Sequence, residues 1–325
     1  MNLHPREVKA KILLHRRIGS DYFRLQLACP EIARLARPGQ FLMLRITDLK
    51  DPFLRRPFSF SQIYRPQEVK KKPLNEGGVE ICYQAVGRGT RLMTQLQEGQ
   101  RVDLLGPLGN GFWPEDQCSW VILVGGGIGV PPLLSWAQEL RRKRAGKKRS
   151  AKASEAPQEL LFLMGAKSKE KIMGLGECRK WGIEVQVATE DGSLGVKGMV
   201  TDLLERELMT GQHGATAIYA CGPNPMLVQI AQVAEQFDRP CQVLLESRMA
   251  CGVGACLGCT VKYREERETA QFSALLNPEF PAGEEGEERE SREGAIPMIS
   301  EIPPFRYARV CKEGPVFDAR KIFWD

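Results

Sequence analysis

Three closely spaced cysteines are the residues of this 325-residue chain best suited to chemistry. Cys251, Cys256 and Cys259 lie in the segment CGVGACLGC and have the spacing C-x4-C-x2-C. Plant-type [2Fe–2S] clusters take this spacing together with one remote cysteine. Structural zinc sites usually take cysteines in two separated pairs. Cys311 is the only cysteine downstream of the triplet, so we predict that it is the fourth ligand. A zinc site and unligated buried thiols are the alternatives.

The residues between these cysteines favour a tightly wrapped loop. Gly252, Gly254, Ala255 and Gly258 are small, so the backbone can approach the sulfurs and direct N–H groups at them. A disulfide framework is not expected, because the N-terminal residues show no apolar secretory signal and the cytosol keeps thiols reduced. We therefore expect a cytoplasmic location.

Composition and charge bound the class of protein. Apolar residues make up 42% and charged residues 26%, as in a soluble globular protein of about two domains. The longest apolar stretch, residues 120–134, is too short and too rich in glycine and proline to be a membrane span. The net charge of +6 combines a basic loop at 141–158 with an acidic insertion at about 265–300. The basic loop has no nucleic-acid recognition module beside it, so we expect no nucleic-acid partner.

The hydrophobic patterns predict two folded domains and a small C-terminal module. Short apolar runs alternate with turn signals up to about residue 112, which predicts a small β-barrel. From Trp120 onwards, buried strands alternate with helices, which predicts an α/β domain with a parallel sheet. The expected domains are residues 1–115, 116–245 and 246–325.

Two motifs of the barrel contain residues suited to a flavin nucleotide. In RRPFSF, arginine can pair with a phosphate, an aromatic ring can lie along a flavin, and serine can reach a flavin nitrogen. In YQAVGRGTRLM, Gly87 and Gly89 form a turn that an anion can approach, and Thr90 is placed to open a helix. A barrel turn and a basic edge are the alternative explanation.

Two further motifs end strands of the α/β domain. GGGIG, residues 125–129, joins a strand to a helix, where glycines permit close approach of a pyrophosphate. Cys221, Gly222 and Pro223 lie at the carboxyl edge of the sheet, where open α/β folds bind ligands. A plain tight turn and a small buried cysteine are the alternatives.

The order of these motifs resembles the ferredoxin–NAD(P)H reductase superfamily, with RPFS, YQAVGRGT, GGGIGVPPL and CGPNPM in succession. The tail, ESRMACGVGACLGCTVK followed by RVCKEGPVFDA, more narrowly resembles the electron transfer subunits of NAD-dependent dihydroorotate dehydrogenase B, the PyrK family. The resemblance covers nearly the whole chain except the two charged insertions. It implies a ferredoxin reductase-like fold: a β-barrel flavin domain, an α/β nucleotide-binding domain and a small C-terminal [2Fe–2S] module.

The resemblance also implies a set of binding residues. For FAD, it implies Arg56, Pro57, Phe58, Ser59, Cys82, Tyr83, Gln84, Gly89 and Thr90. For NAD, it implies Gly125, Gly126, Gly127, Gly129, Cys221, Gly222 and Pro223. For the cluster, it implies Cys251, Cys256, Cys259 and Cys311.

One departure from the family is the acidic insertion between Cys259 and Cys311. Two doublings of loop length cost only about 1.2 kcal/mol. This is small beside metal–thiolate ligation. We therefore retain Cys311 as a ligand.

The family resemblance implies electron transfer rather than catalysis by side chains. A catalytic partner subunit with FMN would oxidise dihydroorotate to orotate in pyrimidine biosynthesis, and electrons would pass through the cluster and FAD of this chain to NAD+. A heterotetramer of two plus two subunits and NADH diaphorase activity of this chain alone are expected. The alternative is a subunit of another NAD(P)H–ferredoxin type oxidoreductase or of a sulfhydrogenase. Related subunits of that kind often have Asp in the first ligand position, so Cys251 favours the dihydroorotate function.

Overall fold

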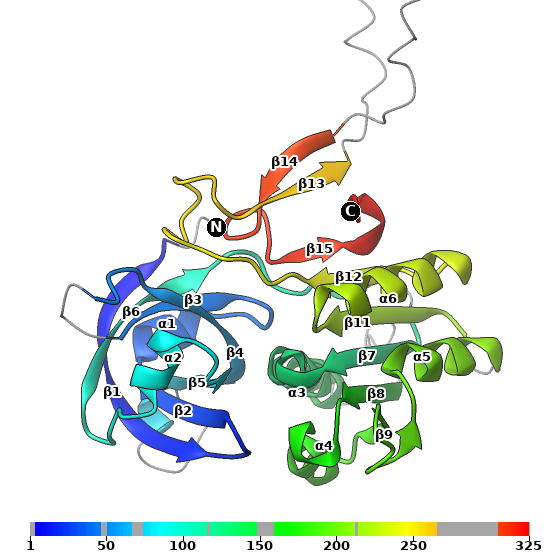
Figure 1. Ribbon diagram of the computed structural model, residues 1–325, viewed down its shortest axis with the longest axis horizontal. Helices are drawn as coiled ribbons and strands as arrows, with labels where there is room; N and C mark the ends of the chain where they lie inside the picture. The colour runs from blue at the N-terminus through cyan, green and yellow to red at the C-terminus, as the bar shows by residue number, and fades with distance from the viewer. Residues whose placement is uncertain are drawn as a thin grey trace, which may run out of the picture.

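The computed structural model describes residues 4–46, 51–66, 74–115, 118–147, 159–211, 214–264 and 305–324. A barrel lies beside an α/β layer, and a hairpin projects above the line where they meet (Figure 1). None of the described helices is long and apolar enough to cross a membrane.

Six antiparallel strands close the barrel, as the turn-rich apolar runs predict. Inward-facing aliphatic and aromatic side chains fill it, among them Leu25, Leu42 and Phe60, each 0% exposed. Helices α1 (Pro30–Leu35) and α2 (Arg88–Met93) and the 3-10 turn η1 (Leu74–Glu76) connect the strands. In spatial order the strands are β1 (Arg6–Arg17), β2 (Tyr22–Ala28), β5 (Gly78–Gln84), β4 (Arg56–Tyr64), β3 (Phe41–Arg45) and β6 (Arg101–Leu108).

A seven-stranded sheet forms the second layer. Its first six strands are parallel, and the last, β15, runs antiparallel to its neighbour β12. In spatial order the strands are β10 (Val196–Lys197), β9 (Glu184–Thr189), β8 (Glu159–Ala166), β7 (Trp120–Gly126), β11 (Thr216–Cys221), β12 (Cys241–Leu244) and β15 (Val316–Asp318).

Helices cover both faces of this sheet. Alternate residues of a strand point to opposite faces, so Leu123 of β7 packs with α3 and α4, whereas Ile122 packs with α5 and α6. The glycine-rich turn is η2 (Gly127–Gly129), and it leads directly into α3. The remaining elements are α3 (Val130–Lys147), α4 (Leu175–Trp181), α5 (Val200–Met209), α6 (Asn224–Gln236), η3 (Lys169–Lys171) and η4 (Ala319–Lys321).

The C-terminal module is an antiparallel hairpin of β13 (Thr260–Arg264) and β14 (Phe305–Arg309). The chain then returns to the sheet as β15, an addition that the hydrophobic patterns do not predict. The division at residues 115 and 245 stays a prediction. The predicted basic loop is partly helical, because α3 continues to Lys147 through a run of arginine, lysine and alanine, which have good helix propensity. Residues 148–158 of that loop, and the acidic insertion at about 265–300, lie outside the described residues.

Candidate functional site

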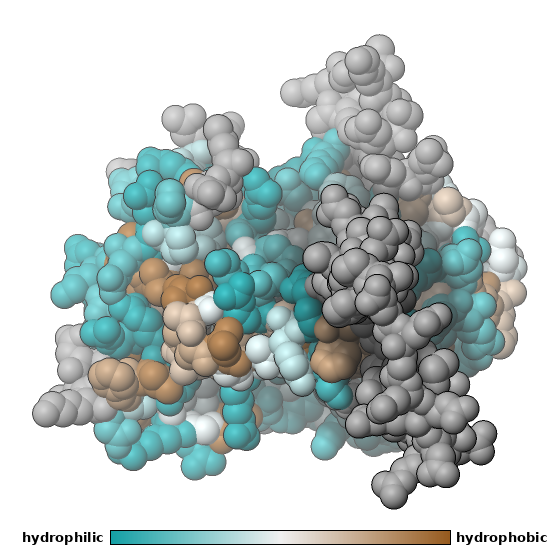
Figure 2. Space-filling model, turned by 90° about the horizontal axis from the view of Figure 1, so that it is seen from above, coloured by the Kyte–Doolittle hydropathy of each residue, from teal (hydrophilic) through white to brown (hydrophobic). Residues whose placement is uncertain are grey.

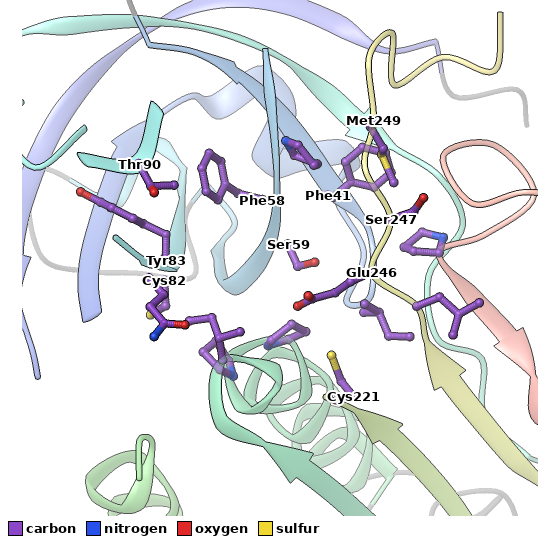
Figure 3. A pocket seen from close by; sticks show the side chains of 18 of the residues that line it. Phe41, Phe58, Ser59, Cys82, Tyr83, Thr90, Cys221, Glu246, Ser247 and Met249 are labelled. Carbon is purple, nitrogen blue, oxygen red and sulfur yellow. The ribbon is translucent and has the colours of Figure 1, made fainter. Parts of the chain in front are cut away.

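A cavity of about 330 Å³ lies between the barrel and the carboxyl edge of the sheet; we call it the barrel-side cavity. Figure 3 shows Ser59, Cys221 and Glu246 pointing into it from β4, β11 and the segment after β12. Its volume is that of a site for a sizeable organic ligand. The residues implied for FAD that line it are Pro57, Phe58, Ser59, Cys82, Tyr83, Gln84 and Thr90.

Arg56 and Gly89, the other two residues implied for FAD, lie against each other beside this cavity. A Cβ atom on Gly89 would lie 3.2 Å from Nε of Arg56 and 2.8 Å from Cδ1 of Ile46. A side chain would therefore fill the space beside the guanidinium, whereas glycine leaves it open. This cradle fits a phosphate, because a guanidinium forms charge-assisted hydrogen bonds with phosphate oxygens.

The sequence motif predicts that Thr90 opens a helix, and this prediction is wrong. Helix α2 begins at Arg88, and Thr90 is its third residue. Its hydroxyl accepts hydrogen bonds from the backbone N–H groups of Val86 and Gly87, each 3.1 Å long. The reason is that the third residue of a helix can reach back to the free N–H groups before it.

A second cavity, of about 660 Å³, lies at the carboxyl edge of β7, β8 and β11; we call it the sheet-edge cavity. Gly126, Gly127, Gly222 and Pro223, four of the residues implied for NAD, line it. The carboxyl ends of these three strands are where open α/β sheets bind ligands. The glycines keep its wall at backbone level, which leaves room for a dinucleotide.

The other residues implied for NAD have different places. Gly125 packs on Val130, where a Cβ atom would lie 2.8 Å from Cγ2. Gly129 lies against the backbone of Cys221, and its own Cβ position is 2.2 Å from the carbonyl oxygen. Cys221 lines the barrel-side cavity rather than the sheet-edge cavity. Burial raises the pKa of the Cys221 thiol well above its ordinary value, so the thiol is neutral.

The two cavities share a wall. Gln84, Ile128 and Glu246 line both of them. Sequence reasoning missed Glu246 as a site residue, although a polar residue two positions after the end of the buried strand β12 is a signal of the ligand-binding edge. Burial raises the pKa of this carboxyl group. The shared wall places a ligand in one cavity next to a ligand in the other.

The four predicted cluster cysteines form two pairs at the base of the C-terminal hairpin. Cys256 lies within hydrogen-bond reach of the Cys251 thiol, and the N–H of Val253 donates to the same sulfur at 3.5 Å. Burial opposes ionisation of Cys251, but hydrogen bonds from the backbone of Cys256, Val253 and Ala255 and from the Cys256 side chain outweigh it and lower the pKa to about 6. Left-handed backbone at Gly252 (φ 73°) and Gly254 (φ 84°) allows the loop to turn its N–H groups inward.

The second pair is held by the hairpin itself. The N–H of Val310 donates to the carbonyl oxygen of Cys259 at 2.8 Å, and the N–H of Cys311 points at the sulfur of Cys259 at 3.4 Å. Burial raises the pKa of the Cys311 thiol to about 12, and a hydrogen bond with Cys259 adds to this. The β13–β14 ladder, from Thr260 paired with Arg309 outwards, thus brings the fourth cysteine to the third.

Two thiol pairs suit two metal ions better than one. The four thiolates of a [2Fe–2S] cluster bind as one pair on each iron. The arrangement of the four cysteines therefore fits a two-iron cluster.

The segment that leads into the cysteine loop lines the barrel-side cavity. Met249 lines the cavity, and Cys251 is only two residues further along the chain, about 7 Å at full extension. A Cβ atom on Gly252 would lie 2.6 Å from Cγ of Met43, so the loop rests on strand β3. A six-stranded barrel, a parallel sheet with a shared cavity wall, and a paired-cysteine module define an iron–sulfur protein of the ferredoxin reductase class.

Comparisons with known proteins give the family within this class. Residues 246–274 match the model of the iron-sulfur cluster binding domain of dihydroorotate dehydrogenase B, and residues 123–232 match that of the oxidoreductase NAD-binding domain. The chain belongs to the family of electron transfer subunits of dihydroorotate dehydrogenase B (NAD(+)). This confirms the resemblance found in the tail motif.

The relatives that establish the family carry that name and cover most of the chain. The protein of Desulforamulus reducens is 35% identical over 84% of this chain and 95% of its own length. That of Caldanaerobacter subterraneus subsp. tengcongensis is 32% identical over 98% and 99%. That of Geobacillus kaustophilus is 38% identical over 83% and 94%.

Solved structures show the same fold. The NADH-dependent reduced ferredoxin-NADP oxidoreductase aligns with a TM-score of 0.70 over 98% of this chain and 91% of its own, at 24% identity. A ferredoxin NADP+ reductase from Neisseria gonorrhoeae aligns with a TM-score of 0.55 over 71% and 91%, at 17% identity. The predicted ferredoxin reductase-like fold is therefore confirmed.

Proposed function

We propose that this chain carries electrons to NAD+ from a catalytic subunit that oxidises dihydroorotate. The observation that supports it most is spatial: the cysteine pairs, the barrel-side cavity and the sheet-edge cavity follow one another. Met249 lines the barrel-side cavity two residues before Cys251, and Glu246 lines both cavities. FAD exchanges electron pairs with NAD(H) and single electrons with an iron–sulfur cluster, so it belongs between them.

Each of the three sites has residues suited to its cofactor. In the barrel-side cavity, Phe58 and Tyr83 offer aromatic surface to a flavin ring, with their centroids 5.9 Å apart, and Ser59 offers a hydroxyl. In the sheet-edge cavity, Gly126 and Gly222 leave room for the dinucleotide. We propose the predicted residue sets for FAD, NAD and the [2Fe–2S] cluster on this basis, with Cys221 assigned to the flavin side.

The exposed side of the cysteine loop is suited to a partner subunit. Cys256 is exposed, and Val253 and Leu257 beside it are 46% and 62% exposed. Figure 2, which views the molecule from the side of the hairpin, shows hydrophobic residues gathered on the barrel half within a hydrophilic surround. We propose that the FMN-containing catalytic subunit docks here, in a heterotetramer of two plus two subunits in the cytoplasm.

The proposal is tested on the purified chain, alone and with its partner. The chain should bind FAD, show the spectrum of a reduced [2Fe–2S] cluster and oxidise NADH with an artificial acceptor. Cys256→Ser should lose the cluster spectrum and electron delivery from the partner, yet keep reduction of FAD by NADH. Cys118→Ser, outside the loop, is the matched control and should keep all three. A normal cluster in Cys256→Ser would contradict the ligand assignment.

The alternative, a subunit of another NAD(P)H–ferredoxin type oxidoreductase or of a sulfhydrogenase, is less well supported. The relatives that are 32–38% identical carry the dihydroorotate dehydrogenase name, whereas the ferredoxin-linked structure is 24% identical and shows the fold alone. Co-purification with a subunit that oxidises dihydroorotate supports the first function. Co-purification with a subunit that reduces ferredoxin or sulfur would support the second.

A further inference from the structure

Ionic contacts join the barrel to the α/β domain at several points. Asp21, at the start of the barrel strand β2, accepts a hydrogen bond of 2.5 Å from the ammonium of Lys171 in η3. Arg65, at the end of β4, pairs with Glu139 of α3 at 3.3 Å. The two pairs are about equally exposed, with side chains 30% and 31% exposed in the first and 26% and 22% in the second. They differ in what lies next to them.

Asp21 touches both proposed cofactor sites through its partners. Its Oδ1 faces Lys171, which lines the sheet-edge cavity. Its Oδ2 accepts a hydrogen bond of 2.5 Å from Nε2 of Gln84, which lines both cavities. Ser20 completes the group, since the Lys171 ammonium also donates to its hydroxyl at 3.0 Å. In contrast, neither Arg65 nor Glu139 lines either cavity.

The charge of Asp21 determines which way the Gln84 amide faces. Hydrogen bonds from Lys171 and Gln84 hold the pKa of Asp21 at about 2, so it is a carboxylate at neutral pH. A carboxylate only accepts hydrogen bonds, and Gln84 must therefore turn its NH2 group toward it. The amide oxygen of Gln84 is then the group left for the shared wall of the cavities.

We propose that Asp21 is a positioning residue that couples the flavin and dinucleotide sites, by orienting the Gln84 amide at their shared wall and holding the Lys171 ammonium at the dinucleotide cavity. The inference rests on the proposed function and adds a residue that none of the family motifs contains. It requires no direct contact between Asp21 and either cofactor. Asp21→Asn removes the charge at constant shape, and its amide can donate as well as accept, so the orientation of Gln84 is no longer unique.

The test compares Asp21→Asn, Lys171→Met and the control Arg65→Gln, each loaded with FAD. Asp21→Asn should shift the visible spectrum of bound flavin without NAD+ present, change the difference spectrum on adding NAD+, and slow flavin reduction by NADH about tenfold, since small misplacements are costly. Lys171→Met should leave the NAD-free spectrum as in the wild type and weaken NAD+ binding about tenfold. Arg65→Gln should match the wild type in all three measurements.

The outcomes separate this inference from the proposed function. If the wild-type chain binds FAD and responds to NAD+, but Asp21→Asn behaves as Arg65→Gln does, the coupling role of Asp21 is wrong and the proposed function stands. If Lys171→Met shifts the NAD-free flavin spectrum as strongly as Asp21→Asn, the separate roles assigned to Lys171 and Gln84 are wrong. A wild-type chain that binds no FAD overturns both the proposed function and the inference.

Discussion

Gly129 is the position at which the smallest change should have the largest effect on the dinucleotide site. It lies where the turn after β7 presses on the turn after β11. A Cβ atom there would lie 2.2 Å from the carbonyl oxygen of Cys221 and 2.7 Å from the nitrogen of Gly222. Both partners are backbone, so no side chain can rotate away. In Gly129→Ala the two turns must separate by about 1 Å to reach an ordinary carbon–oxygen contact.

The expected cost follows from what holds the two turns together. β7 and β11 are paired through Gly125 and Cys221, next to the turns, so the separation strains the sheet ladder itself. Overpacking a well-packed site costs about 1–3 kcal/mol, and we expect the upper end of that range because both sides are backbone. Gly222 also lines the sheet-edge cavity, so its displacement should raise the KM for NADH about tenfold or more.

Urea unfolding and steady-state kinetics with NADH measure the two effects. The matched control is Gly176→Ala in helix α4, where a Cβ atom meets nothing within 4 Å. That variant should gain about 0.5–1 kcal/mol, because alanine favours a helix over glycine. A Gly129→Ala protein with the urea midpoint and the KM of the wild type would refute the reasoning.

Three further predictions test other parts of the structure. Burial raises the pKa of Glu246, so stability falls as the pH rises from the ordinary pKa of glutamate to the raised value, and the full cost is present above it. Glu246→Gln should therefore raise the free energy of unfolding at pH 7 and lose the gain below about pH 4, where an unfolded glutamate is also protonated; equal urea midpoint shifts at both pH values would contradict this. Arg309→Gln removes a 3.0 Å hydrogen bond to the carbonyl oxygen of Gly254 in the cysteine loop. It should lower the free energy of unfolding by about 1 kcal/mol and speed the loss of cluster absorbance to a chelator. An unchanged rate of loss would show that this hydrogen bond does not stabilise the loop. Arg24→Met leaves the carboxylate of Glu80, which is 2% exposed, without its cation and should lower the free energy of unfolding in urea by about 3 kcal/mol. Adding Glu80→Gln to this variant should recover part of that loss. Strictly additive effects of the two substitutions would show that the pair does not interact.

The sequence predicts the two layers and the cysteine module well, because local signals encode them. The alternation of short apolar runs and turns predicts the barrel, and the strand–glycine–helix pattern at residues 120–134 predicts η2 and α3 where they occur. The spacing of Cys251, Cys256 and Cys259 places three sulfurs in one loop. The fourth, Cys311, is predicted by elimination, and the structure supplies the cause: the ladder that starts at Thr260 and Arg309.

Residues at the contact between the two layers are not predictable in this way. Asp21 and Lys171 belong to no motif, and Glu246 opens the tail motif without being marked there as a site residue. The importance of all three comes from how the barrel faces the sheet. Cys221 is a similar case. Its position at the end of β11 indicates that it lies at the sheet edge, but it does not indicate which of the two cavities the residue lines. Local patterns encode elements, whereas these contacts depend on the packing of segments up to 150 residues apart, as for Lys171 and Asp21.

The β13–β14 hairpin makes the spacing between Cys259 and Cys311 independent of what joins its far ends. The ladder pairs Thr260 with Arg309 at the cysteines and Arg264 with Phe305 at the other end. Peptide spliced between Arg264 and Phe305 enters and leaves on adjacent strands, so its length does not alter the ligand geometry. This position is therefore an insertion site, at which a reporter or a surface tether can be attached while the electron path stays intact.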